Sequence, residues 1–399
     1  EAITSLPLWG PCECARAAFF LFEGGGMVAI QTRYHGMHVV RASKTLYVAT
    51  SGSDTGRGTA ADPYLTFTRA RDEVADWWWD TLSKTITIQA ANGSFPISSA
   101  IDLSHPCGRT MYFTGENTYA KTMSSVQSSS GSTGNWSVII NLNSVADITT
   151  ADYALITAAS GGTLPKYIEG CHAITNVDGG NVRITIASKH RAATSPSGAV
   201  AAAVVIVPTN ITATGCAGFI PRGGMSLGLL SKIALVGDGT AGKFAIDVSY
   251  ANARAILGES VGISGWNQGL AAYDGGVIQA TPVVCVSGCA IGIASLKSSS
   301  ISLTSPVISG CSTAGAYSAN HGSIAINGST LTGNAIGSQA LNKAFLGMSS
   351  SNVNGNTTGA SASEFGYIKA ASLTLANNGT DLNPVANTVS STYGYISTT

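Results

Sequence analysis

Three acidic residues near the middle of the chain carry the functional group that glycan cleavage uses. They are Asp247, Glu259 and Asp274. Hydrolysis of a glycosidic bond normally needs one protonated and one ionised carboxyl group, about 5 Å apart in retaining enzymes and about 6.5 to 9.5 Å apart in inverting ones. Aromatic side chains that could hold a sugar ring occur in the same stretch: Tyr250, Trp266 and Tyr273. We therefore take the acids as candidate catalytic residues and the aromatic residues as candidate glycan-binding residues.

The acids have a second interpretation, because polar residues recur at one position of a repeat described below. Asp274 lies nine residues after Gly265, and Glu364 lies nine residues after Gly355. A solvated face would give the same column, and its acids would then have no chemical role. The same alternative applies to Asp247 and Glu259.

Other chemistries find less support in the sequence. An eliminating lyase needs a base beside a neutralising cation. Lys232, Arg254 and Lys297 are available for that role, but an Asp-rich calcium motif is missing. The sequence has no Gly-x-Ser-x-Gly, P-loop or HExxH motif, so nucleotide and zinc-protease chemistry are unsupported. We expect no metal in the candidate site and no cofactor.

Residues 1 to 45 differ from the rest of the chain and contain a separate group of zinc-type ligands. Cys12 and Cys14 precede His35 and His38. The two cysteines are closer in sequence than those of common structural zinc sites. We therefore favour an attachment arm over a zinc site for this segment.

A repeat between Ile263 and about Thr380 supplies the elements that position the candidate residues. Six turn-like pairs mark it: Gly265-Trp266, Gly288-Cys289, Gly310-Cys311, Gly333-Asn334, Gly355-Asn356 and Asn378-Gly379. The steps between them are 23, 22, 23, 22 and 23 residues. A period near 22 admits leucine-rich repeats or a parallel β-helix, whereas propeller blades and helical repeats need about 33 to 50 residues.

Two apolar columns keep step with these turns. One contains Ile278, Ile301, Ile324, Leu346 and Ile368, and the other contains Val284, Val307, Leu331, Val353 and Leu375. Apolar and small polar residues alternate around them, which is the period of a β-strand. The leucine-rich pattern is missing, and so short a unit cannot bury its apolar face alone. These observations predict an all-β fold, a right-handed parallel β-helix whose rungs stack about 4.8 Å apart.

The composition of the chain limits its partners. Of 399 residues only 11% are charged, and 21 basic residues balance 21 acidic ones. A neutral surface lacks the electrostatic footprint of nucleic-acid binding, and no apolar run is long enough to cross a bilayer. An uncharged stack of strands tends to associate, so we expect an oligomer. The eight cysteines are too few for a disulfide framework in this length, and Cys289 and Cys311 are expected to pack in the core.

The start of the solenoid combines a helix with a sequence motif. The helical spacing of Phe67, Ala70 and Val74 predicts an amphipathic helix over residues 64–79 that caps the open end of the solenoid. The alternative for Trp77 to Trp79 is a sugar platform. Tyr47-Val48-Ala49-Thr50-Ser51-Gly52-Ser53-Asp54, a Gly-rich loop and Asp62-Pro63-Tyr64 resemble the first segment of pectate-lyase-like β-helices in bacteriophage tail spikes and fibres.

That resemblance, together with the rungs, covers most of residues 46 to 380. It implies a homotrimer on the virion tail that acts outside the cell on a host surface polysaccharide. It also implies that residues 1–45 attach the subunit to other tail proteins. The motif is more specific for the architecture than for chemistry, because one fold can cleave, deacetylate or merely hold a glycan.

Residues 135–207 break the repeat. Asp178-Gly179 lies between two strand-like runs, which is a strong hairpin signal. Antiparallel hairpins are foreign to parallel rungs, so we predict a small inserted β-barrel, either a glycan-contacting module or an inert spacer. The predicted organisation is an arm at 1–45, the start of the β-helix with its capping helix at 46–134, the barrel at 135–207, rungs at 208–382 and a tail at 383–399.

Three functions agree with these features. The first is a virion tail spike or fibre subunit that binds host surface polysaccharide, with or without cleaving it. The second is a polysaccharide-degrading enzyme, a hydrolase or a lyase, that is independent of a virion and uses Asp247, Glu259 or Asp274. The third is a purely structural spike or surface adhesin.

Overall fold

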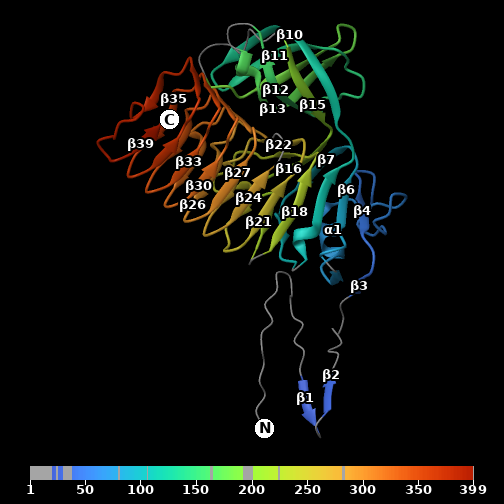
Figure 1. The fold of residues 1–399 in the computed structure, drawn as a ribbon. Coiled ribbons are helices and arrows are strands. Elements are labelled where there is room, and N and C mark those ends of the chain that lie inside the picture. The colour runs from blue at the N-terminus through green and yellow to red at the C-terminus, as the bar shows by residue number, and fades with distance from the viewer. Residues whose placement is uncertain are drawn as a thin grey trace.

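The main body of the protein is a parallel β-solenoid in which the chain winds repeatedly through three sheets (Figure 1). The computed structural model describes residues 20–23, 26–29, 38–79, 81–105, 107–161, 165–191, 201–222, 225–280 and 284–398. From residue 209 onward each turn contributes one short strand to each sheet. The predicted all-β fold and parallel β-helix are therefore confirmed.

The first sheet has nine strands that pair in parallel register. They are β7 (Gly93–Ile97), β16 (Thr209–Ala213), β19 (Ala234–Val236), β22 (Val261–Ser264), β25 (Val284–Ser287), β28 (Val307–Ser309), β31 (Thr330–Thr332), β34 (Asn352–Asn354) and β37 (Thr374–Ala376).

The second sheet also has nine strands and carries the candidate site. They are β8 (Ile101–Leu103), β17 (Phe219–Pro221), β20 (Phe244–Val248), β23 (Gln268–Ala272), β26 (Ile291–Leu296), β29 (Ala314–Ala319), β32 (Ile336–Ala340), β35 (Thr358–Ala362) and β38 (Thr380–Asn383).

The third sheet has eleven strands, because two strands from the start of the chain extend it. They are β4 (Lys44–Val48), β6 (Ile86–Ala90), β9 (Met111–Gly115), β18 (Ser226–Ser231), β21 (Arg254–Leu257), β24 (Val277–Ala280), β27 (Ser300–Leu303), β30 (Ser323–Ala325), β33 (Phe345–Gly347), β36 (Tyr367–Lys369) and β39 (Tyr395–Ser397).

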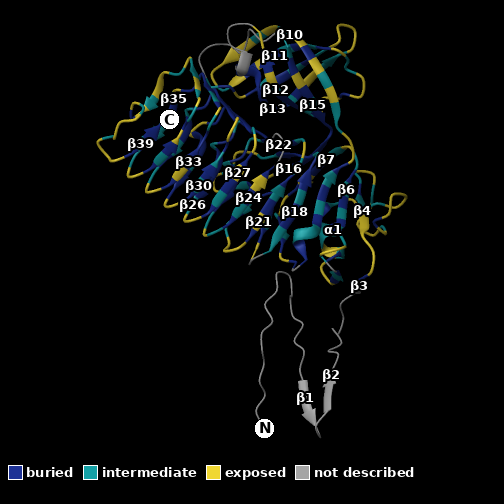
Figure 2. Cartoon of the chain, in the orientation of Figure 1, coloured by how far each residue is buried: buried dark blue, intermediate teal, exposed yellow. Residues whose placement is uncertain are grey.

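The core lies between the three sheets, as the dark strands of Figure 2 show. The first predicted column is confirmed, because neighbouring strands pair in the order Ile278, Ile301, Ile324, Leu346 and Ile368. The second column is correct only in part. Val286 pairs with Ile308, and Ile308 pairs with Leu331, so Val284 is not the member of this column on β25. Val307 pairs with Cys285 and points out of the solenoid core. Ile308 is also 23 residues before Leu331, which keeps the period, whereas Val307 is 24 residues before it.

The repeated glycines form the corner between the first and second sheets. Gly265, Gly288, Gly310, Gly333 and Gly355 have φ between 61° and 75°, a region that favours glycine. In the later rungs the residue after the glycine is a buried asparagine. The side-chain Nδ2 of Asn334 donates to Oδ1 of Asn356 at 3.0 Å, and Asn356 donates to Asn378 in the same way at 3.0 Å. This asparagine ladder fixes the corner from one rung to the next.

A closed barrel interrupts the rungs between the third and first sheets. Its strands are β10 (Tyr119–Ser132), β11 (Asn135–Leu142), β12 (Tyr153–Ser160), β13 (Gly170–Asp178), β14 (Arg183–Ser188) and β15 (Ala201–Val207), and a short 3-10 helix η2 (Pro165–Ile168) precedes β13. The antiparallel pairing of Asp178 with Arg183 confirms the predicted hairpin. The barrel includes β10, so the predicted start at residue 135 is one strand too late.

The barrel packs on the outer side of the first sheet (Figure 1). A separate apolar cluster joins the two parts: Leu155, Cys171 and Val207 from the barrel with Ala234, Cys285 and Val307 from the sheet. This contact explains why Val307 is apolar although it points away from the solenoid core. The backbone N–H of Arg191 also donates to the carbonyl of Gly333 at 2.9 Å. The barrel is thus held against at least four rungs.

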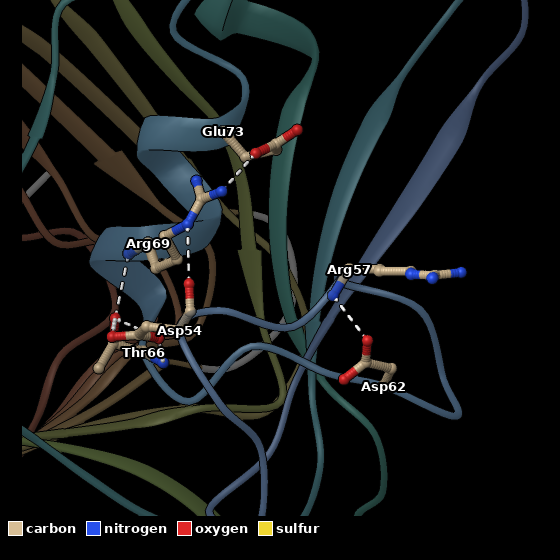
Figure 3. A network of polar contacts seen from close by, with 6 residues as sticks. All are labelled: Asp54, Arg57, Asp62, Thr66, Arg69 and Glu73. Atoms are coloured by element: carbon tan, nitrogen blue, oxygen red, sulfur yellow. Dashed lines mark hydrogen bonds and ion pairs between the residues drawn. The ribbon is translucent and has the colours of Figure 1, made fainter.

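The helix at the start of the solenoid is shorter than predicted. Helix α1 (Phe67–Glu73) begins after Thr66, whose hydroxyl accepts from the N–H of Arg69 at 3.1 Å. Asp54 accepts from the N–H groups of Leu65 and Thr66 at 3.1 and 2.9 Å. Arg69 in turn pairs with Glu73 at 2.7 Å (Figure 3). The motif that carries the resemblance is therefore a structural clamp around the first turn of the helix.

Phe67 of α1 belongs to the solenoid core, where its ring lies 5.2 Å from that of Phe95. The prediction of a helix as far as residue 79 is wrong. Residues 77–79 form strand β5 (Trp77–Trp79), which pairs in parallel with β3 (His38–Val40). Burial alternates along these three residues, as it does in a β-strand: Trp77 and Trp79 are buried, and Trp78 between them is half-buried. Capping by α1 stays a prediction.

The remaining elements are a hairpin near the N-terminus and one short turn. Strands β1 (Phe20–Glu23) and β2 (Gly26–Ala29) pair antiparallel, and the 3-10 helix η1 (Gly108–Thr110) precedes β9. The side chains of Cys12, Cys14, His35 and His38 lie outside the described residues, as does most of the predicted attachment arm.

Candidate functional site

A row of outward-facing residues crosses the second sheet and contains two aspartates. Asp102 on β8 pairs with Ile220 on β17, and the adjacent Phe219 pairs with Ile246 on β20. Ile220 therefore lies between Asp102 and Asp247 in this row. Because adjacent strands are about 4.8 Å apart, the two aspartate backbones are about 9.6 Å apart. The row continues through Ala271, Ala294, Tyr317, Gln339 and Ser361. We call it the polar row.

Arg222 connects the N-terminal end of the polar row to an aromatic residue. Its guanidinium forms an ion pair with Asp102, and its Nη1 donates to the hydroxyl of Tyr250 at 2.5 Å. The guanidinium also lies 5.4 Å from the centre of the Tyr250 ring. The position of Arg222, directly after β17, places a cation between the two aspartates. The second carboxylate oxygen of Asp102 is buried and accepts no hydrogen bond from the described residues.

Asp247 lies in a less polar environment than an ordinary surface aspartate. Burial raises its pKa, and the hydroxyl of Ser249 and the charge of Arg222 offset part of that increase. The hydroxyl of Ser249 donates directly to Asp247. A carboxyl group with a raised pKa stays protonated at higher pH, which is the property that a general acid needs.

Aromatic side chains border the middle of the polar row, where the row itself is made of small residues. Ala271 and Ala294 face outward from adjacent strands and are fully buried, so larger neighbouring side chains cover them. Tyr273 donates to Gln268 at 2.8 Å, and its ring lies 6.1 Å from that of Phe244. Burial is the main reason that the pKa of Tyr273 is raised, and the charges of Asp247 and Tyr317 add to it. A carboxyl group and three aromatic rings thus surround two short side chains.

The other two predicted acids lie apart from Asp247. Glu259 lies at the corner between the third and first sheets, where it pairs with Lys232 at 3.4 Å. Asp274 lies at the corner between the second and third sheets, where it pairs with Lys297 at 3.5 Å. Both are exposed, as a solvated face predicts. The structure brings neither of them into the polar row.

The predicted aromatic residues also separate. Tyr250 and Tyr273 lie beside the polar row, as described above. The prediction that Trp266 contacts a glycan is wrong, because only 2% of this residue is exposed. Its indole N–H donates to the carbonyl of Leu235 at 3.1 Å. It fills the core behind the corner turn, where a saccharide has no access to the ring. A tryptophan directly after a left-handed glycine points inward here.

Sequence reasoning missed three residues on which the site depends: Asp102, Arg222 and Tyr317. Asp102 precedes Asp247 by 145 residues, and the barrel lies between them in the sequence. Arg222 occupies a stretch that precedes the regular repeat. A usable signal was the strand Ile101–Leu103, in which a charged residue stands between two buried apolar ones. Such an acid must face outward.

The described residues offer no constellation for a metal. No group of three or more His, Cys, Asp or Glu side chains among them could hold a metal ion. The six described cysteines are buried, and burial raises the pKa of Cys171, Cys285, Cys289 and Cys311. Thiols of this kind pack as small apolar groups, as predicted for Cys289 and Cys311. In the described part of the chain, no helix has the length and apolar character needed to span a membrane.

Comparison with known proteins assigns no family to the chain. No family model matches it, and no curated protein matches its sequence. Similar solved structures include XylC in complex with xylose, with 12% identity over 85% of this chain and 69% of that one, at a TM-score of 0.32. A glycoside hydrolase shares 10% identity over 89% of this chain and 95% of its own, at 0.26. The tailspike of Pseudomonas phage phi297 shares 10% over 75% and 66%, at 0.23. The fold of this chain therefore rests on its own strand pairing.

Proposed function

We propose that the protein binds a polysaccharide along the polar row and that it is a subunit of a bacteriophage tail spike or fibre. The observation that carries the binding proposal is the arrangement of Asp247, Tyr273 and Tyr317 around the short side chains of Ala271 and Ala294. A pyranose ring presents apolar C–H groups on its faces and hydroxyl groups at its edge. Aromatic rings suit the former, and carboxylate and amide groups suit the latter.

The virion assignment is supported by the resemblance of the segment at residues 47–64 and by the rung architecture. In this proposal three copies associate, and residues 1–45 attach them to other tail proteins outside the host cell. The chain has 21 basic and 21 acidic residues, so its copies carry no net charge that would repel one another. Association of several copies is therefore physically reasonable. Three equivalent polar rows would act together on one polymer, which raises the apparent affinity through effective concentration.

Cleavage of the bound polysaccharide is a second candidate function, favoured by the two aspartates of the polar row. Asp247 has the raised pKa of an acid, and Asp102 forms an ion pair with Arg222. Side chains whose backbones are about 9.6 Å apart can bring their carboxyl groups to the separation of about 6.5 to 9.5 Å that an inverting mechanism uses. Asp247 would give its proton to the leaving glycosidic oxygen. Asp102 would take a proton from the water that attacks the anomeric carbon.

Incubation with purified capsular polysaccharides and lipopolysaccharides from candidate bacterial hosts tests both functions. Binding is followed by biolayer interferometry, and chain length is followed by size-exclusion chromatography. Binding to one of these glycans supports the proposal, and shortened chains that disappear with Asp247→Asn and with Asp102→Asn add cleavage. A protein that is monomeric in solution and binds none of the glycans would contradict the proposal.

A further inference from the structure

The corner between the second and third sheets carries a regular column of left-handed residues. In successive rungs these pairs are Asn320-His321, Asn342-Lys343 and Glu364-Phe365, with φ between 50° and 66°. Backbone hydrogen bonds join the turns, from His321 N–H to Asn342 O and from Lys343 N–H to Glu364 O, both at 3.1 Å. Side chains at equivalent positions of adjacent turns are therefore about one strand spacing apart.

Phe365 and Tyr393 stand out in this column. Their rings stack with centres 5.1 Å apart and planes 5° from parallel, yet 59% of Phe365 and 64% of Tyr393 are exposed. Both residues also have a φ of 63°, which is costly for a bulky side chain. The equivalent positions of earlier rungs hold Ser298, His321 and Lys343. The corner turn imposes the left-handed conformation on every residue of the column, so it does not explain the choice of aromatic side chains here. Neither ring contributes to the solenoid core, and the exposure of both is left without a structural gain.

The two rings line a surface cavity of about 710 Å³. The turn residues Asn320, His321, Asn342, Lys343 and Glu364 line the cavity, together with Ser391 and Thr392 of the segment that follows β38. The Phe365 ring stacks on that of Tyr393, and both residues line this cavity. Amide groups, hydroxyl groups and an aromatic ring thus converge on one space. Its one lysine and its one glutamate cancel in charge.

A second aromatic row extends the apolar surface onto the third sheet. Phe345, Tyr367 and Tyr395 occupy paired positions on β33, β36 and β39, with ring centres 5.7 and 5.8 Å apart. Phe365 precedes Tyr367 by two residues, and Tyr393 precedes Tyr395 by two. Five aromatic rings therefore gather in the last three rungs. The earlier rungs have serine at the positions equivalent to Phe345, namely Ser300 and Ser323.

We propose that this cavity is a second saccharide-binding site, with Phe365 as the ring on which an uncharged pyranose unit stacks. Asn320 and Asn342 would then bind the edge of the sugar, because each amide offers both donors and an acceptor to hydroxyl or N-acetyl groups. An apolar peptide would need an aliphatic pocket, which the lining residues do not provide. A strongly charged glycan would leave either Lys343 or Glu364 opposed by a like charge.

The site is independent of the polar row. Its residues come from rungs at the C-terminal end of the solenoid, whereas Asp102 and Asp247 come from the beginning. Binding at this site requires neither Asp102 nor Asp247, and it does not require that the protein cleaves polysaccharide. Its existence does not depend on the virion assignment.

Isothermal titration calorimetry of the full chain with chitohexaose, cellohexaose and xylohexaose tests the inference. We expect one of these uncharged probes to bind, and Phe365→Gly to weaken that binding about tenfold through loss of the stacked ring. Phe365→Trp should retain binding, because it keeps an aromatic face. Asn135→Ala, at an exposed barrel position outside both sites, should bind the hexasaccharide as the wild type does.

The melting temperature of Phe365→Gly separates binding from a structural role. Glycine tolerates the left-handed conformation, so the melting temperature should not fall while affinity is lost. A lower melting temperature with unchanged affinity would overturn the proposal, because the ring would then serve the fold alone. Failure of the wild type to bind any of the three hexasaccharides would overturn it as well.

Discussion

Asp102 and Asp247 lie in the same outward row of the second sheet, separated by the single strand β17. The solenoid creates this relationship by returning the chain to the same sheet after the barrel has been completed. Residues that are remote in sequence thereby acquire a fixed spacing of two strands. The stiffness of stacked parallel strands is what makes such a pair usable for recognition of a polymer.

The raised pKa of Asp247 predicts how cleavage depends on pH. Burial favours the protonated carboxyl, so an acid step performed by Asp247 should persist to a pH above the ordinary aspartate range and then fall as the group ionises. The measurement is the initial rate of polysaccharide shortening between pH 4 and pH 8. Asp247→Asn should remove the reaction at all pH values. A rate that rises through this range would assign the acid step elsewhere.

The contact between the barrel and the solenoid should weaken in acid. His172 and His190 are buried there, and burial lowers the pKa of His172 to about 4 and that of His190 to about 3. Their unfolded pKa is about 6.5, so the unfolded chain binds more protons below that value. Stability is therefore complete above about pH 7 and is lost as pH falls toward 4. Each histidine contributes a slope of about 1.4 kcal/mol per pH unit within that window.

Urea unfolding at pH 7.5 and at pH 5 measures this loss. The ring of His190 lies 4.1 Å from that of Tyr167, and neither of its ring nitrogens has a hydrogen-bond partner among the described residues. His190→Phe should therefore keep the packing and reduce the pH dependence by about half. Tyr167 and Glu169, which lie beside the histidines, are unchanged in this variant. If the free energy of unfolding changes equally with pH in the wild type and in His190→Phe, groups other than His190 cause the pH dependence.

The asparagine ladder at the corner between the first and second sheets should contribute strongly to the free energy of unfolding. Asn356 accepts from the backbone N–H of Asn334 at 2.9 Å and donates to the carbonyl of Leu331 at 2.9 Å. Asn356→Ala leaves both backbone groups buried without these partners, at a cost of about 2 to 4 kcal/mol. Asn135→Ala, at an exposed barrel position, is the matched control and should cost less than about 0.5 kcal/mol. Similar losses in urea unfolding would contradict a specific ladder.

Trp266 should affect stability without affecting binding. Its ring is part of the solenoid core and its N–H is bonded to Leu235. Trp266→Phe should lower the free energy of unfolding by about 1 to 3 kcal/mol, because it leaves space in the core and a carbonyl without its donor. Saccharide affinity of the folded variant should match that of the wild type. If Trp266→Phe lost saccharide affinity while its free energy of unfolding stayed unchanged, Trp266 would be a ligand contact after all.

The repeat could be predicted because each rung obeys the same local rules. A glycine such as Gly310 is needed where φ is positive, and an inward position such as Ile301 must be apolar in every rung. These requirements recur at a fixed step and are visible in one sequence. The error at Val307 has the same origin, because the barrel makes an outward position apolar as well.

The site was harder to predict because its members do not recur. Asp102 and Arg222 belong to the first rungs, where the barrel separates strands that pair in space. Trp77–Trp79 was misread because three residues are too few to distinguish helical spacing from alternation. Acids such as Glu259 look identical to Asp247 in sequence. The structure separates the two, because Asp247 lies on strand β20 whereas Glu259 lies at a corner between strands.

The central claim is that the polar row binds polysaccharide, and the most direct measurement compares binding by Tyr273→Ala and by Leu82→Ala. Tyr273 borders the row, whereas Leu82 is an exposed residue, 84% accessible, near the start of the chain. Affinity is measured for the glycan that binds the wild type, at equal oligomeric state and with melting temperatures recorded. We predict a loss of about tenfold for Tyr273→Ala and none for Leu82→Ala. Equal affinity of both variants would contradict the claim.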